Sequence, residues 1–205
     1  MIKFLDDPLY YIALHPSDLF FKNISSFFKK NQITDNILKS DFKFNYVLKA
    51  PFYLSNLNTE NELIDKFKNI NLKEYQCILK YNFDINSLEK INNIQILKLN
   101  VNKELNYFSS MIIREFDIFR RTLNSDEIKI DLLRFNQLSE KELIYYHIWG
   151  YPYYFEFSYQ GIPISYENII LKYNLDFKTV FFSSVKLLRQ ENIKSWNYKE
   201  LADIF

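Results

Sequence analysis

The chain has 205 residues, 19% of them aromatic, and 26 basic side chains nearly balance 25 acidic ones to give a formal charge of +1. This length suits one hydrophobic core, so we expect a single domain over residues 1–205. A charge near zero argues against general binding to nucleic acid or anionic membranes, which requires a positive field. The single cysteine, Cys77, excludes a disulfide framework and a multi-cysteine zinc site.

The start of the chain lacks the features of a secretion signal. Asp6 and Asp7 interrupt what would be its apolar region, and no small-residue cleavage site follows. No apolar run approaches the length of about 18 residues that a membrane-spanning helix needs. We therefore expect a cytoplasmic protein without a membrane segment. The heavy use of Lys, Asn, Ile, Phe and Tyr is typical of codon bias in an AT-rich genome, so single asparagines and lysines carry little functional weight.

The first part of the chain combines short apolar segments with helical patterns. Residues 10–14 predict a strand that ends at His15-Pro16, and a helix begins at Ser17. Residues 42–54 predict a strand in which Pro51 favours a sheet edge or a bulge. Thr59-x-x-Glu62 has the pattern of a capping box at the start of a second helix. The apolar faces of the two helices are Phe20, Ile24, Phe27 and Phe28, and Leu63, Ile64, Phe67 and Ile70.

The remainder of the chain continues this alternation irregularly. Strands are predicted over residues 75–81, 94–99, 151–164 and 180–188. A long helix is predicted over residues 103–123, a further helix begins at Ser139 and ends at Gly150, and the tail from Asn192 is expected to be a short helix or loop. The buried stripe of the long helix is Leu105, Phe108, Ile112, Phe116 and Phe119. Without the glycine-rich turns of a dinucleotide fold, this order predicts an α+β fold with antiparallel sheet.

Local spacing provides no catalytic signature. The two glycines, Gly150 and Gly161, do not form a phosphate-binding loop, and no metal-ligand spacing is present, so we expect neither a metal nor a cofactor. We interpret Cys77 as a buried structural thiol, His15 as a polar residue at a strand end, and His147 as a packing residue on a helix. The aromatic cluster at 149–155 fits either a corner of the core or the wall of a pocket.

Four segments carry a family resemblance. In their residues and in their order along the chain, these segments resemble those of a bacterial family linked to phosphonate metabolism. The segments are residues 11–16, Asn45-Tyr46-Val47-Leu48-Lys49-Ala50-Pro51-Phe52, Phe116-Asp117-x-Phe119-Arg120 and Trp149-Gly150-Tyr151-Pro152-Tyr153. That family belongs to the 2H phosphoesterase superfamily, which includes RNA 2′,3′-cyclic phosphodiesterases. The resemblance implies two pseudo-symmetric lobes around a central cleft, each an antiparallel sheet with helices on its outer side.

The superfamily's chemistry uses two His-x-Thr/Ser motifs, and this chain resembles both positions without the essential residues. The first motif falls on Asn45-Tyr46-Val47 and the second on Gln160-Gly161-Ile162. Carboxamides therefore replace the general base and the general acid, and aliphatic residues replace the phosphate-binding hydroxyls. Carboxamides do not titrate near pH 7, and each lost acid or base ordinarily contributes about 10²–10⁴ in rate. Activity by the superfamily mechanism is not expected.

Three hypotheses about function remain open. The first is a degenerate protein that keeps a cleft for a phosphate-containing ligand or a regulatory role. The second is a phosphodiesterase for a cyclic or phosphonate-related phosphoester with rearranged catalytic residues. The third is an interaction or structural module with a closed cleft, which packing of Val47 and Ile162 in the core would favour. The cleft residues implied by the resemblance are Asn45, Val47, Lys49, Arg120, Tyr151, Gln160 and Ile162.

Two of these cleft residues have a second interpretation. On a regular strand Lys49 shares a face with Asn45 and Val47, but it equally fits an ordinary lysine at a strand edge. Arg120 equally fits an ion pair with Asp117, three residues earlier on a helix.

Overall fold

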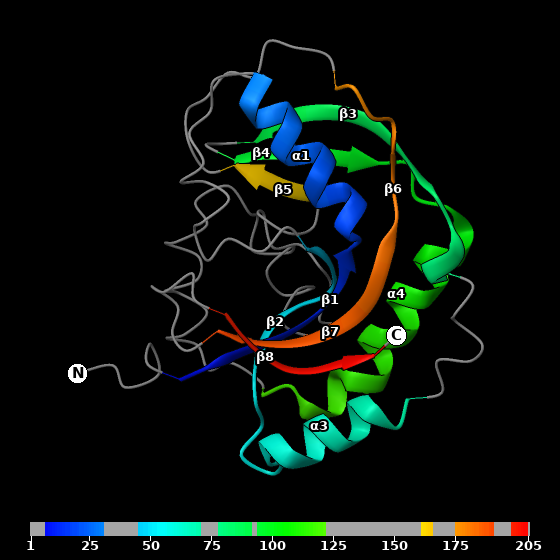
Figure 1. Cartoon of the computed structure of the whole chain (residues 1–205). Coiled ribbons are helices and arrows are strands. Elements are labelled where there is room, and N and C mark those ends of the chain that lie inside the picture. The colour runs from blue at the N-terminus through cyan, green and yellow to red at the C-terminus, as the bar shows by residue number, and fades with distance from the viewer. Residues whose placement is uncertain are drawn as a thin grey trace.

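The computed structural model describes residues 7–30, 45–70, 78–91, 94–121, 161–165, 175–190 and 198–204. These residues form two four-stranded antiparallel sheets, in agreement with the predicted α+β class (Figure 1). The first sheet has the order β2-β1-β7-β8, with β1 Leu9–Pro16, β2 Tyr46–Tyr53, β7 Phe182–Gln190 and β8 Tyr198–Ile204. The second has the order β5-β4-β3-β6, with β3 Phe83–Ile91, β4 Ile94–Leu99, β5 Gly161–Ser165 and β6 Thr179–Val180.

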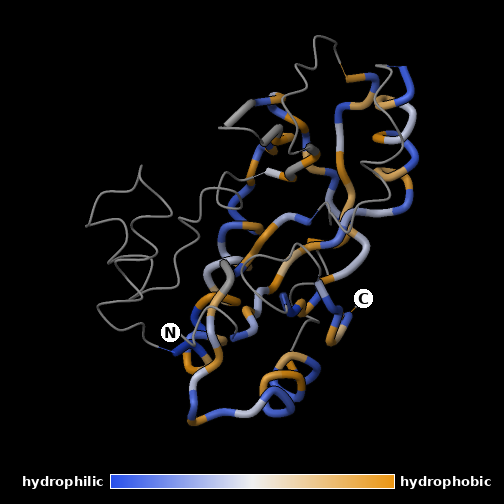
Figure 2. The backbone as a smooth tube through the Cα atoms, turned by 90° about the vertical axis from the view of Figure 1, so that its left-hand side faces the viewer, coloured by the Kyte–Doolittle hydropathy of each residue, from blue (hydrophilic) through white to orange (hydrophobic). Residues whose placement is uncertain are grey.

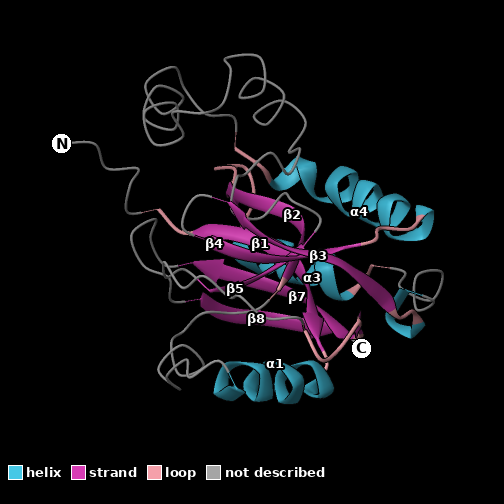
Figure 3. Cartoon of the chain, turned by 90° about the horizontal axis from the view of Figure 1, so that it is seen from above, coloured by secondary structure: helices cyan, strands magenta, loops and turns pink. Residues whose placement is uncertain are grey.

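Three α-helices surround these sheets in the described part of the chain: α1 Asp18–Lys30, α3 Glu60–Lys68 and α4 Lys103–Phe116. In Figure 1, α1 crosses in front of β3, β4 and β5. Figure 3 shows α1 and α4 on opposite sides of the strands. None of the helices in the described ranges has the length and apolar character needed to cross a membrane.

Helix α1 follows the predicted pattern closely. Its buried residues are the four that the spacing predicts, Phe20, Ile24, Phe27 and Phe28. Asp18 lies in the first turn and Lys29 and Lys30 in the last, so the side-chain charges complement the helix dipole. The amphipathic character of α1 is visible in Figure 2, where its turns at the upper right alternate between hydrophobic and hydrophilic colours.

The predicted capping box at the start of α3 is confirmed. The Glu62 amide donates to Thr59 Oγ1 over 3.2 Å, and the Thr59 amide donates to Glu62 Oε2 over 2.7 Å. Both N-terminal amides are therefore satisfied, and Leu63 and Phe67 are buried on the inner face.

Three element predictions are wrong. The helix predicted to reach residue 123 ends at Phe116, because a 3₁₀ turn over Asp117–Phe119 leads into a β-bridge between Leu54 and Arg120. Ile78–Lys80, at the end of a predicted strand, is a 3₁₀ turn. The tail forms β8 because pairing with β7 supplies hydrogen bonds that outweigh its weak strand propensity.

Strand β3 is not evident from its polar sequence, and the helix predicted from Ser139 lies outside the described residues.

Both faces of the first sheet carry buried apolar side chains. On β1, Tyr10, Ile12 and Leu14 belong to the main core that α1, α3 and α4 share. Tyr11 and Ala13, on the alternate face, belong to a second, smaller cluster. That cluster also contains Val47 and Leu188, with Tyr198 packed against it. The predicted edge position of the strand that contains Pro51 is confirmed, since β2 forms an outer strand of its sheet.

Candidate functional site

Asn45 and His15 meet on the face of the first sheet that bears the smaller cluster. Leu14 of β1 lies opposite Tyr46 of β2, so the preceding Asn45 comes beside the following His15. His15 Nδ1 lies 2.9 Å from Asn45 Oδ1, within hydrogen-bond distance. Asn45 is only 2% exposed, and among the described residues its Nδ2 has no hydrogen-bond partner. The buried carboxamide thus has one satisfied end and one free donor.

His15 is half-buried between the first sheet and helix α1. Burial is the largest influence and lowers the pKa of His15 below its ordinary value, which the hydrogen bond with Asn45 offsets only in part. The field of Lys186 also lowers this pKa, and those of Asp203 and Glu200 raise it. On its other side the imidazole lies against the Phe21 ring of α1, with the ring centres 5.3 Å apart.

Three charged side chains near His15 form a compact group. Lys186 Nζ lies 2.8 Å from Glu200 Oε2 and 3.5 Å from Asp203 Oδ2, so β8 supplies two carboxylates to one ammonium. Because Lys186 is paired twice, it does not provide an uncompensated positive charge beside His15.

Val47 shares the face of Asn45, as strand alternation predicts. Its side chain is 5% exposed and packs in the smaller cluster with Tyr11, Ala13 and Leu188. An aliphatic residue at this position has no hydroxyl for a phosphate, but it extends the apolar surface beside the carboxamide.

Lys49 does not share this face, so that expectation is wrong. Val47 lies opposite Ala13 and Lys49 lies opposite Ile12, which leaves an extra residue in β2 between the two pairs. Such a β-bulge reverses the alternation of side chains that follow it. Lys49 consequently faces the main core, to which its partner Ile12 belongs, and its side chain is completely buried.

The Lys49 ammonium reaches helix α4 and the turn that follows. Its Nζ lies 3.5 Å from Asp117 Oδ1, 3.4 Å from the Ile113 carbonyl oxygen and 5.2 Å from the centre of the Phe52 ring. Burial lowers the pKa of Lys49 from 10.5 to about 8, and the Asp117 carboxylate only partly counteracts this effect.

Arg120 belongs to the same ion-pair group as Lys49. Its Nε lies 2.7 Å from Asp117 Oδ1 and a terminal nitrogen lies 3.3 Å from Oδ2, which confirms the alternative interpretation of this arginine as a partner of Asp117. Partial burial alone would raise the pKa of Asp117, but the Arg120 hydrogen bond and the Lys49 charge outweigh it and hold this pKa low. Asp117 therefore engages both predicted cleft cations.

Of the remaining predicted residues, Ile162 does not lie on the sheet face that carries Asn45. Ile162 lies in β5 opposite Leu97, completely buried in the main core. Tyr151 and Gln160 lie outside the described residues. The structure thus brings together Asn45, Val47 and His15. The proximity of His15 follows from the pairing of β1 with β2, which spacing along the chain does not reveal.

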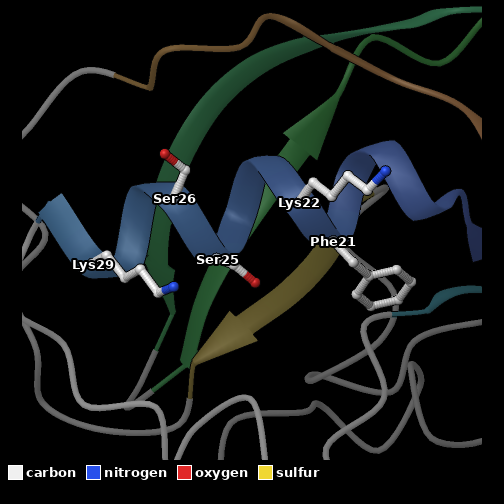
Figure 4. A pocket seen from close by; sticks show the side chains of 5 residues that line it. All are labelled: Phe21, Lys22, Ser25, Ser26 and Lys29. Carbon is white, nitrogen blue, oxygen red and sulfur yellow. The ribbon is translucent and has the colours of Figure 1, made fainter.

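A shallow hollow of about 460 Å³ lies along α1 (Figure 4). Its described lining consists of Phe21, Lys22, Ser25, Ser26 and Lys29. Phe21 connects it to the candidate site, because the same ring contacts His15. Within the described ranges no three His, Cys, Asp or Glu side chains gather in a way that could hold a metal ion.

Comparison with family models identifies the relationship. Residues 47–160, more than half of the chain, match a family described as "Protein of unknown function (DUF1045)". The chain belongs to this family. DUF1045 is phosphonate-associated, in agreement with the resemblance found in the sequence. The match extends from Val47 to Gln160 and includes Lys49, Arg120 and Tyr151, and Asn45 lies two residues before it. Comparisons with curated proteins and with solved structures find no match.

Proposed function

We propose that this DUF1045 protein is a 2H phosphoesterase-like protein that lacks the superfamily's acid–base pair and binds a phosphate-containing small molecule at the Asn45 face. The observation that carries this proposal is the buried Asn45 amide, which has a free donor at the position where the resemblance places the first motif histidine. The family match, the two antiparallel sheets and the flanking helices are consistent with it.

The free Asn45 donor favours a ligand that offers an acceptor. A buried polar group without a partner costs about 1–3 kcal/mol, and a ligand oxygen placed at Asn45 Nδ2 would remove that cost. Phosphoryl and phosphonyl oxygens are strong acceptors for amide donors. The neighbouring Val47 and Ala13 make the surroundings of the Asn45 amide apolar, which increases the cost of leaving its donor without a partner.

The charges around the site favour binding over catalysis by the superfamily mechanism. Asn45 does not titrate, and Val47 has no hydroxyl to hold a phosphate oxygen. Lys49 faces the main core with Asp117, so its ammonium does not accompany Asn45. A site of this kind holds its ligand with uncharged donors and packing.

A thermal-shift panel tests the proposal directly. The panel contains 2′,3′-cyclic nucleotides, nucleoside diphosphates, ribose phosphates and small phosphonates. A ligand at 100 times its Kd adds about 2.7 kcal/mol to the unfolding free energy, which for a chain of this size raises Tm by about 5–11 °C. Asn45→Ala should abolish the shift. Asn58→Ala should preserve it, because Asn58 is not buried and its amide donates to the Ile118 carbonyl, away from Asn45. A ligand shift that survives in Asn45→Ala would contradict the proposed site.

A second candidate function follows from His15. A neutral imidazole next to a motif position has the chemistry of a general base, and one such base contributes about 10²–10⁴ in rate. A phosphodiesterase with rearranged residues would therefore hydrolyse 2′,3′-cyclic AMP at a rate that His15→Asn lowers by that factor. Chromatographic detection of the adenosine monophosphate products separates this activity from binding alone.

The third hypothesis, a module with a closed cleft, gains only partial support from packing. Val47 and Ile162 are both buried, but they belong to different clusters on different sheets. They do not close one cleft between them. Absence of any shift across the panel would favour this hypothesis over the other two.

A further inference from the structure

His15 controls more than the position of Asn45, because the hydrogen bond between them determines which end of the carboxamide is free. We propose that His15 is a positioning residue that turns the Asn45 amide nitrogen toward the ligand, so that the site selects a hydrogen-bond acceptor and binds it more tightly when His15 is protonated. This inference rests on the proposed function, since it concerns the same ligand at the same residue.

The chemistry of the pair allows two arrangements when His15 is neutral. An Nδ1–H group donates to Asn45 Oδ1 and leaves Nδ2 free, which is the arrangement given by the 2.9 Å contact between Nδ1 and Oδ1. If the proton resides on Nε2, the Nδ1 lone pair accepts from Asn45 Nδ2 and the free end becomes an acceptor. Only the first arrangement offers a donor to a phosphoryl oxygen.

Protonation of His15 removes the second arrangement. Both nitrogens of an imidazolium carry a proton, so Nδ1 must donate and Asn45 must present Oδ1 to it. Every molecule in the population then has Nδ2 free. If about one-half to one-tenth of the molecules with a neutral His15 already have Asn45 Nδ2 free, complete protonation of His15 strengthens binding by about two- to tenfold.

The surroundings of His15 limit the other sources of pH dependence. Among the described residues, Lys186 on β7 and Glu200 and Asp203 on β8 are the charged side chains whose fields act on it, and Lys186 is paired with both carboxylates. Ser184 lies opposite His15 on β7, and the Phe21 ring covers it from α1. Imidazole is the side chain that ordinarily changes its charge between pH 5 and 8. A pH effect on ligand binding in that interval is therefore assigned to a histidine, and His15 is the one that contacts Asn45.

Calorimetric titration with 2′,3′-cyclic AMP between pH 5.5 and 8 tests the inference. This probe keeps one negative charge over the interval, so any change in affinity comes from the protein. For the unsubstituted protein, Kd should fall as the pH decreases, by up to about two- to tenfold when His15 is fully protonated. In His15→Asn, the introduced carboxamide lies where the imidazole Nδ1 was and can pair with Asn45 either as a donor or as an acceptor. It does not titrate, so Kd should not depend on pH. His147→Asn, which alters the other histidine, should keep the pH profile of the unsubstituted protein.

Nitrogen NMR of the unsubstituted protein provides a second readout that does not depend on a variant. At pH 7.5, saturating 2′,3′-cyclic AMP should shift His15 toward the form with a proton on Nδ1. A Kd that is constant with pH, or a ligand that leaves the His15 tautomer unchanged, would overturn the inference while the proposed function survives. A profile that His147→Asn removes and His15→Asn retains would also overturn it. Absence of binding at every pH would overturn both.

Discussion

Replacing Lys49 with methionine should raise the free energy of unfolding at neutral pH. Burial lowers the pKa of this lysine from 10.5 to about 8. Each pKa unit corresponds to about 1.4 kcal/mol, so holding the ammonium in its folded position costs about 3 kcal/mol. Methionine has a similar length and no charge. Asp117 keeps Arg120 and has a side chain that is 36% exposed, so the substitution does not leave a buried carboxylate alone. We expect a gain of about 1–3 kcal/mol at pH 7, in the range found when a buried ion pair is replaced by apolar groups.

The gain should decrease as the pH rises. Between about pH 8 and 10.5 folded Lys49 is deprotonated while the unfolded chain still holds its proton, so the unfolding free energy of the unsubstituted protein increases with pH. Below pH 8 both states are protonated and the full cost remains. The difference between variant and unsubstituted protein should therefore be largest near pH 7 and should shrink by about 3 kcal/mol by pH 10.5.

Urea denaturation at pH 7, 8, 9 and 10 measures this difference, in which contributions from other groups cancel. Lys66→Met is the matched control, because Lys66 pairs with Glu115 over 2.5 Å with both side chains substantially exposed. That variant should change stability by less than about 1 kcal/mol and without a trend in pH. A Lys49→Met difference that is constant from pH 7 to 10 would refute the reasoning. A decrease of about 3–5 kcal/mol in the unfolding free energy of Lys49→Met would also refute it, because that is the result when the loss of a buried ion pair outweighs the relief of desolvation.

Two local features yield further predictions. Thr59→Ala should lower the unfolding free energy by about 1 kcal/mol, because it removes the capping box with Glu62. Circular dichroism melting should then show a decrease in Tm of about 2–4 °C. An unchanged Tm would show that α3 does not depend on this cap. Gly161→Ala should be more damaging, because a Cβ there would lie 2.5 Å from Ile96 Cγ2 and 2.6 Å from the Leu97 carbonyl oxygen. We expect a loss of about 1–3 kcal/mol in urea denaturation, and a neutral effect would mean that β5 moves away from β4 at little cost.

The helices of the described region were largely predictable because their signals are local. The spacing of Phe20, Ile24, Phe27 and Phe28 defines the buried face of α1, and the Thr59–Glu62 motif marks the start of α3. The strands near residues 10–14, 94–99 and 180–188 were predictable from apolar segments for the same reason. By contrast, β3 and β8 acquire their conformation by pairing with the adjacent strands β4 and β7, so strand propensity alone did not indicate them.

The candidate site was predictable only where strand alternation is regular. Alternation places Asn45 and Val47 on one face, and the structure agrees. The same rule fails for Lys49, because the bulge in β2 inserts one residue before it. His15 was the main omission, since its contact with Asn45 spans 30 residues and depends on the register of two strands.

The position of β1 between β2 and β7 also governs when the site can form during synthesis. His15 and Asn45 leave the ribosome early, but the neighbouring strand β7 comes much later, and Ser183 donates to the His15 carbonyl across 168 positions. Contacts this distant in sequence slow folding, because closure of a long loop must precede their formation. The nascent chain therefore carries an open edge on β1 until its final strands emerge, and an unpaired strand edge favours aggregation during that interval.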